Sequence, residues 1–223
     1  MIARELLASA QVPGGGEMRL FRHDRDFMIV LGGNELMSSR MSGSEVALAE
    51  QTLARLGPRK RTRMLVGGYG MGFTLRAALA KLDADAEVIV AELMPEIIDW
   101  ARGPMAELAA GCLDDRRVVL VIGDVVDQIA GAPDCYDAIL LDVDNGPDGL
   151  TREDNNELYT KRGLRAARAA LRPGGVLAIW SAAKDDAFAA RLRRNGFTVD
   201  EVTVRARSNG KGPKHVIWFC RAD

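Results

Sequence analysis

The chain has 223 residues, of which 48% are hydrophobic and 27% are charged. This length fits one α/β domain, and the composition excludes a disordered or membrane-spanning protein. Its 30 Lys and Arg residues nearly balance its 31 Asp and Glu residues, which gives nucleic-acid binding no electrostatic support.

The three cysteines, Cys112, Cys135 and Cys220, are widely spaced and form no CxxC pair. Because three thiols leave one unpaired in any disulfide scheme, they favour a reducing compartment and indicate no metal site. No stretch approaches the roughly 18 continuous apolar residues of a transmembrane helix. We therefore expect a cytoplasmic protein without a bound metal.

Residues 1–56 predict an N-terminal unit that consists of a short β meander and one helix. From residue 17 to about residue 38, short apolar runs are separated by Asp- and Gly-rich turns, as in antiparallel strands. Residues 43–56 carry apolar side chains at helical spacing, with Ser42 or Ser44 available as an N-cap.

Residues 57–223 predict a Rossmann-like unit in which apolar strands alternate with helices. The expected parallel strands cover residues 64–66, 87–91, 118–122, 138–142 and 176–180. Helical patterns cover residues 72–82, 95–101, 158–171 and 185–195. Continuous apolar strands that alternate with helices form a parallel sheet covered on both faces, so a doubly wound α/β fold is expected.

The chain ends in two β-rich runs, residues 196–206 and 215–220. Their connection is too short for a parallel crossover, so they predict an antiparallel hairpin. The hairpin completes a mostly parallel seven-stranded sheet that resembles the sheet of class I methyltransferases. A nicotinamide-binding Rossmann domain would instead continue with another parallel βα unit, which disfavours an NAD-dependent oxidoreductase.

A glycine-rich turn follows the first parallel strand and contains Gly68, Gly70 and Gly72. Glycines allow positive φ angles and close approach of a ligand to backbone N–H groups. Such a turn alone serves NAD, FAD, nucleotides and S-adenosylmethionine alike, or is simply a tight turn. The three glycines are candidate cofactor-binding residues.

Two acidic residues stand at the ends of the next two strands. Glu92 is placed to accept hydrogen bonds from ribose hydroxyls, and its alternative role is a surface carboxylate or a helix cap. Asp124 is placed to accept a hydrogen bond from the exocyclic amine of adenine, or to cap the helix that follows it. These two roles of Asp124 are compatible.

An acidic loop follows the fourth strand and contains Asp142 and Asp144. Their side chains point in opposite directions if the strand continues, so only one is expected to face a ligand. Trp180, at the end of the fifth strand, lines an acceptor pocket or belongs to the core. For His23 and His215 we expect surface or structural roles.

Several of these segments together resemble the spermidine/spermine synthase family over roughly residues 60–180. The resemblance rests on the glycine turn, Glu92, the Gly-Asp pair that ends at Asp124, and the strand that ends at Asp142. It implies a class I methyltransferase fold, a nucleoside held by Glu92 and Asp124, and a possible homodimer. It also implies that Asp142 binds the ligand and assists removal of a proton from an attacking amine, with Asp144 nearby as a substrate-binding residue.

The sequence departs from the family pattern in the acceptor region. Met71 stands where the family carries an aspartate that binds the aminopropyl ammonium of decarboxylated S-adenosylmethionine. The tyrosine that the family places near the start of the first helix is replaced within residues 42–45, and the acidic loop has Asn145-Gly146 in place of Asp-Pro. These departures favour methyl transfer from S-adenosylmethionine to a small acceptor. Aminopropyl transfer to a polyamine and a non-catalytic nucleoside-binding module are the alternatives.

Overall fold

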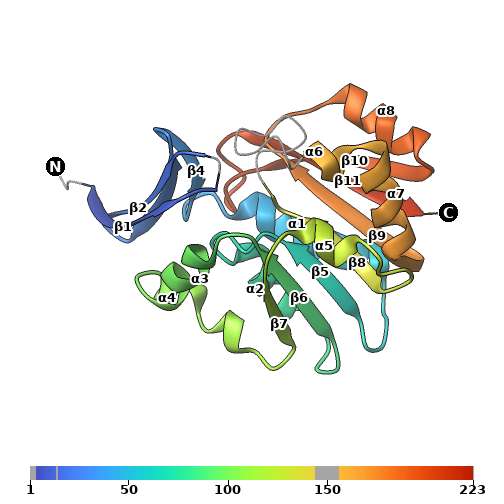
Figure 1. Ribbon diagram of the computed structural model, residues 1–223, viewed down its shortest axis with the longest axis horizontal. Coiled ribbons are helices and arrows are strands. Elements are labelled where there is room, and N and C mark those ends of the chain that lie inside the picture. Colours follow the sequence, from blue (N-terminus) through green and yellow to red (C-terminus); the bar gives the residue numbers. More distant parts are fainter. Residues whose placement is uncertain (1–3, 14, 144–155, 223) are drawn as a thin grey trace.

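The computed structural model describes residues 4–13, 15–143 and 156–222. The chain forms a four-stranded antiparallel sheet and a seven-stranded sheet that is flanked by helices (Figure 1). The small sheet stands at one end of the larger α/β layer, and helix α1 (Gly43–Leu56) follows it in the chain.

The N-terminal sheet has one strand more than the sequence predicted. Its strands pair in chain order and are β1 (Glu5–Gln11), β2 (Glu17–His23), β3 (Asp26–Leu31) and β4 (Asn34–Ser38). The expected meander began only at β2, because the segment ELLASAQ of β1 lacks the β-branched and aromatic residues that mark strands. Pairing with β2 supplies the hydrogen bonds that define β1.

The large sheet has the predicted doubly wound topology, with strand order β10-β11-β9-β8-β5-β6-β7. The strands are β5 (Arg63–Gly67), β6 (Glu87–Glu92), β7 (Val118–Ile122), β8 (Tyr136–Leu141), β9 (Leu171–Ser181), β10 (Phe197–Arg205) and β11 (Lys214–Ala222). Strand β11 is antiparallel to both of its neighbours, which confirms the predicted terminal hairpin. Because β5 lies between β6 and β8, the chain changes direction of winding there, and such points are where α/β sheets bind ligands.

Most predicted helices are present, some with shifted ends. Besides α1, they are α2 (Phe73–Leu79), α3 (Pro95–Arg102), α4 (Ala106–Ala109), α5 (Val125–Ile129), α6 (Asn156–Tyr159), α7 (Lys161–Ala170) and α8 (Asp186–Arg194), with a 3₁₀ turn η1 at Cys112–Asp114. The helix expected over residues 158–171 is divided between α6 and α7. Its last residue, Leu171, begins β9 instead, because it pairs with Tyr136 of β8.

The core consists of two hydrophobic layers, one on each face of the large sheet. Successive residues of β5 alternate between them: Met64 and Val66 pack in one layer, and Leu65 packs in the other. The first layer includes residues of α1, α2 and α3, and the second includes residues of α5, α7 and α8. The uninterrupted apolar strands of the sequence are explained by burial on both faces.

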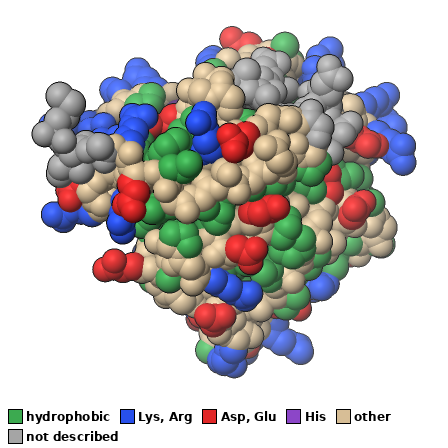
Figure 2. Space-filling model, turned by 60° about the vertical axis from the view of Figure 1, so that its left-hand side comes forward, with side chains coloured by type: hydrophobic (Ala, Val, Ile, Leu, Met, Phe, Trp, Pro, Cys, Tyr) green, Lys and Arg blue, Asp and Glu red, His purple; other side chains and the backbone are tan. Residues whose placement is uncertain are grey.

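Among the described residues, no helix is both long and apolar enough to cross a bilayer. All three cysteines are free thiols. On the face shown in Figure 2, acidic and hydrophobic side chains share the centre, and Lys and Arg side chains lie mostly toward the outline.

Candidate active site

The glycine turn lies between β5 and α2, at the point where the sheet changes direction. Gly68, Gly70 and Gly72 have φ angles of +85°, +55° and +76°, a region that favours glycine. A Cβ on Gly68 would lie 2.5 Å from the carbonyl oxygen of Asp142, so the turn packs directly against the segment after β8. Gly72 is the N-cap residue of α2, beside the Tyr69 hydroxyl, and lines neither of the two cavities described below.

Glu92 holds the glycine turn in place. Its side chain is buried, and Oε2 accepts hydrogen bonds from the backbone N–H groups of Tyr69 (2.8 Å) and Gly70 (3.4 Å). Its Oε1 accepts from the N–H of Met94 at 2.9 Å. Burial raises the pKa of Glu92, and these backbone donors oppose that rise. The carboxylate thus organises the turn while it lines the adjoining cavity, and its predicted contact with a ribose stays a prediction.

Asp124 caps α5, one of the two roles expected for it. Its side chain accepts a hydrogen bond from the N–H of Val126 at 2.9 Å. The same residue lines the cavity beside the glycine turn. Capping fixes the carboxylate at the end of β7 and leaves it at the cavity, so the predicted adenine contact stays compatible with the cap.

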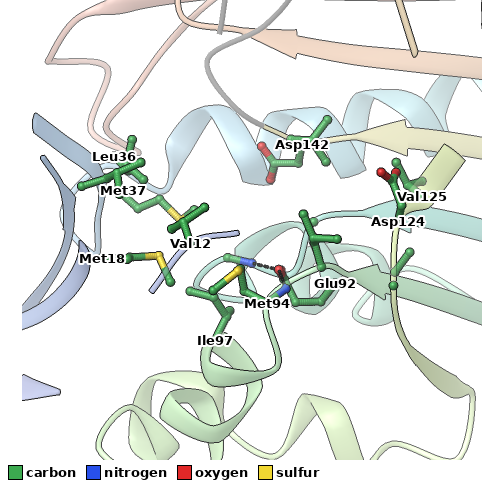
Figure 3. Close-up of a pocket in the computed structure, with 17 residues that line it drawn as sticks. Val12, Met18, Leu36, Met37, Glu92, Met94, Ile97, Asp124, Val125 and Asp142 are labelled. Atoms are coloured by element: carbon green, nitrogen blue, oxygen red, sulfur yellow. Dashed lines mark hydrogen bonds between the residues drawn. The ribbon is translucent and has the colours of Figure 1, made fainter. Parts of the chain in front are cut away.

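The first cavity, of about 130 Å³, lies at the carboxyl ends of the parallel strands. It is lined by Val12, Met18, Leu31, Leu36, Met37, Gly68, Gly70, Ala91, Glu92, Leu93, Met94, Ile97, Gly123, Asp124, Val125, Asp142 and Val143. Figure 3 shows side chains of the N-terminal sheet, including Met18 and Met37, opposite Glu92 and Met94, with Asp142 and Asp124 at the other edges. The N-terminal sheet therefore supplies one wall of this cavity, a contribution that the sequence did not reveal.

Asp142 follows β8 and lines both cavities. Its Oδ2 accepts a hydrogen bond from the Thr74 hydroxyl at 2.6 Å. Burial raises the pKa of Asp142 to about 6, and the hydrogen bond from Thr74 opposes this rise. A carboxylate with this pKa accepts and returns protons near neutral pH.

The second cavity, of about 270 Å³, adjoins the first at Leu36, Met37, Gly70 and Asp142. Its lining is Glu35, Leu36, Met37, Ser38, Met41, Glu45, Tyr69, Gly70, Met71, Phe73, Asp142, Trp180, Ala182 and His215. The shared residues make the two cavities neighbouring compartments of one site. A nucleoside in the first and an acceptor in the second would meet beside Asp142.

Glu45 is the main residue of this site that the sequence analysis missed. It lies in the first turn of α1, and burial together with the nearby charge of Asp142 raises its pKa to about 8. Ser42 makes no side-chain capping bond, so the expected cap is absent. Ser44 instead lies 2.6 Å from Glu45 Oε2 and 2.9 Å from His215 Nδ1.

His215 was expected to have a surface or structural role, whereas the structure places it in the lining of the second cavity. Its ring lies edge-on to that of Trp180, with centroids 4.7 Å apart, and burial lowers its pKa. Trp180 is itself buried in the lining, and its indole Nε1 has no hydrogen-bond partner among the described residues. Its predicted contact with a substrate stays a prediction.

Asp144 lies outside the described residues, so its role is untested. Met71 is buried in the lining of the second cavity, where the family resemblance leads one to expect a carboxylate. In the parts of the chain that the structure describes, no group of three or more His, Cys, Asp or Glu side chains could hold a metal ion.

Comparison with known proteins agrees with the resemblance noted in the sequence. A family model described as "Spermine/spermidine synthase domain" matches residues 29–185. Polyamine aminopropyltransferase 2 of Pseudomonas aeruginosa is 29% identical over 163 residues, which are 71% of this chain and 44% of that protein. The enzyme of the same name from Hyperthermus butylicus is 33% identical over 125 residues, which are 56% of this chain and 39% of that protein. The chain thus spans less than half the length of these relatives.

Solved structures share the fold over almost the whole chain. A spermidine synthase in complex with the transition-state analogue AdoDATO superposes with a TM-score of 0.78 and 21% identity, covering 98% of this chain and 74% of that one. The spermidine synthase of Thermotoga maritima superposes with a TM-score of 0.75 and 18% identity, covering 98% and 72%. The predicted class I methyltransferase-like sheet and the N-terminal antiparallel sheet therefore form a spermidine synthase-like fold.

Proposed function

The chain belongs to the spermine/spermidine synthase family, and we propose that it transfers an aminopropyl group from decarboxylated S-adenosylmethionine to a small amine. Its relatives are named polyamine aminopropyltransferases, which favours this reaction over the methyl transfer that the sequence analysis placed first. The nucleoside would occupy the first cavity, and the acceptor amine the second.

The observation that carries the proposal is the charge of the two cavities. Their described lining contains acidic side chains and no Lys or Arg. The acidic residues are Glu35, Glu45, Glu92, Asp124 and Asp142. Decarboxylated S-adenosylmethionine carries a sulfonium and an ammonium and no carboxylate, so it suits an acidic site. The carboxylate of S-adenosylmethionine itself would have no cationic partner among these residues.

The magnitude of this discrimination follows from Coulomb's law. Two like charges about 4 Å apart repel by about 4 kcal/mol at an effective dielectric constant of about 20. Even a third of this repulsion weakens binding about tenfold. We therefore expect the decarboxylated compound to bind at least tenfold more tightly than S-adenosylmethionine.

The reaction is a displacement at the carbon next to the sulfonium. The lone pair of a neutral amine forms the new C–N bond, and the electrons of the broken C–S bond go to sulfur, which leaves as a neutral thioether. The site contributes orientation and proton removal from the acceptor ammonium. Asp142 would accept this proton because it lies where the two cavities meet.

Met71 remains the main departure from the family pattern, because a thioether offers no charge to an ammonium. The described lining of the second cavity does contain the carboxylates of Glu45 and Asp142, and Asp142 accepts a hydrogen bond from Thr74 of α2. If they do not replace the missing carboxylate, the chain binds a nucleoside without turnover. This non-catalytic module is the second candidate function.

A homodimer remains a proposal that rests on the family resemblance.

Calorimetry and a turnover assay test the proposal together. We expect the affinity order decarboxylated S-adenosylmethionine above S-adenosylhomocysteine and S-adenosylmethionine. With a panel of mono-, di- and triamines, we expect release of the thioether nucleoside. Tighter binding of S-adenosylmethionine would refute the choice of donor, and tight binding of the donor without turnover on any amine would favour the non-catalytic module.

A further inference from the structure

Two carboxylates from distant parts of the chain face the second cavity. Glu45 comes from the first turn of α1, and Asp142 comes from the end of β8. Thr74 of α2 contacts both residues, because its Oγ1 lies 2.6 Å from Asp142 Oδ2 and 3.4 Å from the backbone carbonyl oxygen of Glu45. No Lys or Arg of the described lining neutralises the two side chains, and the charge of Asp142 raises the pKa of Glu45. Two carboxylates that interact in one cavity without a cation favour a state in which they hold one proton between them.

Beyond Glu45, a short chain of polar groups leads away from the cavity. The Ser44 hydroxyl lies 2.6 Å from Glu45 Oε2 and 2.9 Å from Nδ1 of His215, which is partly exposed. A hydroxyl has one hydrogen, so the direction of both bonds is set by the protonation of Glu45. When Glu45 is ionised, His215 donates to Ser44 and Ser44 donates to Glu45. When Glu45 is protonated, Glu45 donates to Ser44 and Ser44 donates to His215.

We propose that Glu45 and Asp142 form a one-proton pair that receives the proton of the acceptor ammonium, and that Ser44 and His215 pass a proton from this pair toward solvent. The proposal rests on the proposed function, because it requires an amine acceptor in the second cavity. It assigns a role to Glu45, Ser44 and His215 that the resemblance to the family did not supply.

The relay conserves the number of protons. The acceptor ammonium gives one proton to ionised Asp142, and the neutral amine then attacks the donor carbon. Glu45 passes its own proton through the Ser44 hydroxyl to Nδ1 of His215, and His215 releases its Nε2 proton to solvent. The pair again holds one proton, now on Asp142, and His215 is left as its Nδ1–H tautomer. Return of the pair's proton to Glu45 and proton exchange of His215 with solvent restore the starting state, so the net product of a full cycle is one proton in solution. No oxidant or other co-reactant is required.

The protonation tendencies of the groups define the starting state. The raised pKa of Glu45, about 8, keeps it protonated at neutral pH, whereas the pKa of Asp142, about 6, leaves it mostly ionised. Protonation of Asp142 removes the charge that helps to raise the pKa of Glu45, which favours release of the Glu45 proton, and burial lowers the pKa of His215, so the imidazolium loses its Nε2 proton readily. The remaining titratable groups in the described lining are Glu35, which is exposed, and Tyr69, whose pKa is raised by burial. Neither is positioned in the chain from Glu45 to His215.

The terminal hairpin fixes this arrangement. The N–H of Gly43 donates to the carbonyl oxygen of Ala206 at 2.7 Å. A Cβ at Gly43 would lie 2.6 Å from the carbonyl carbon of Arg207 and 2.7 Å from the nitrogen of Ser208. The missing side chain therefore allows the hairpin to approach the first turn of α1. This approach brings His215 of β11 to Ser44.

A ¹³C-carboxyl NMR titration tests the pair without any need for turnover. In the wild-type protein we expect Glu45 to titrate near pH 8, and E45Q identifies its signal. In D142N the midpoint should fall below that of the wild type, because the neighbouring charge is gone, and should stay above the ordinary value of 4.5, because burial is the larger cause of the raised pKa. E50Q, an exposed change on the same helix, is the control and should leave the midpoint unchanged. A wild-type midpoint near 4.5, or a midpoint that D142N does not move, would overturn the pair.

Chemical rescue tests the relay. We expect H215A to lower kcat about a hundredfold or more while the affinity for decarboxylated S-adenosylmethionine stays unchanged, since proton-transfer groups contribute factors of about 10²–10⁴. Added imidazole should restore part of kcat in H215A, and H23A should need no rescue. A reduced kcat that imidazole does not restore and an unchanged pH profile would make His215 merely structural. Failure of the wild type to bind the donor or to react would instead refute the proposed function, and the NMR titration would still report on the pair.

Discussion

Replacement of Gly68 by alanine should damage both stability and ligand binding. The new Cβ would lie 2.5 Å from the carbonyl oxygen of Asp142, and the φ angle of +85° is strained for any L side chain. The strain costs about 1–2 kcal/mol, and the overlap with backbone adds about 1–3 kcal/mol. We therefore expect a loss of about 2–5 kcal/mol. Relief of the overlap must move either the glycine turn or the segment that carries Asp142.

Gly111→Ala is the matched control. Gly111 has a similar φ angle of +70°, but a Cβ there would meet no atom within 4 Å, so only the strain remains. In thermal unfolding, a chain of this size loses about 2–4 °C of Tm per kcal/mol. We expect G68A to lose more Tm than G111A, and calorimetry should show weakened nucleoside binding in G68A alone. Equal stability of the two variants with unchanged binding would refute the packing argument.

Three further predictions concern single side chains. D124A should lose about 1 kcal/mol with its capping bond to Val126, whereas D124N should keep the stability and lose nucleoside affinity in calorimetry. D137A should cost about 1–3 kcal/mol in denaturant unfolding, because the buried Asp137 accepts from a backbone N–H and pairs with two arginines that are themselves partly exposed. The pKa of Glu45 is raised from 4.5 to about 8. Between pH 4.5 and pH 8, Glu45 is ionised in the unfolded chain and still protonated in the folded chain, so the Tm of the wild type should fall as the pH rises. The Tm of E45Q should fall less steeply over this range. Equal slopes of Tm against pH in the two proteins would contradict the raised pKa.

The fold was predictable because its signals are local and repeated. Each parallel strand is an apolar run buried on both faces, as the alternation of Met64, Leu65 and Val66 between two core layers shows. The turn glycines and the acidic strand ends are likewise local features, and the topology alone brings them to one edge. Strand β1 was missed because its definition comes from its partner and not from its own residues.

The acceptor side was less predictable because its residues are functional only through contacts distant in sequence. Ser42 and Glu45 have the spacing of a capping box, so Glu45 is easily interpreted as a helix-capping residue. The structure shows that Ser42 makes no such bond and that Glu45 turns to the cavity. His215 lies in a strand, and only the pairing of β11 with β9 and its approach to α1 place it beside Ser44. A polar residue within the apolar strand HVIWFC was the available signal.

The structure also changes the interpretation of Met71, which stands where the family pattern has a carboxylate. Loss of a carboxylate from the glycine turn does not leave the second cavity without an additional acidic side chain, because Glu45 enters it from α1. The N-terminus of a helix favours an ionised acid, whereas burial and the neighbouring Asp142 oppose ionisation, and the raised pKa of Glu45 shows that the opposing effects dominate. The position of an acid on α1 depends on the terminal hairpin, because Gly43 and Ser44 contact residues of that hairpin, whereas an acid on the glycine turn would not depend on it. Under the proposed function, recognition of the acceptor would therefore be coupled to the contact between Gly43 and the hairpin, and binding of the donor to the contact between Glu92 and the glycine turn.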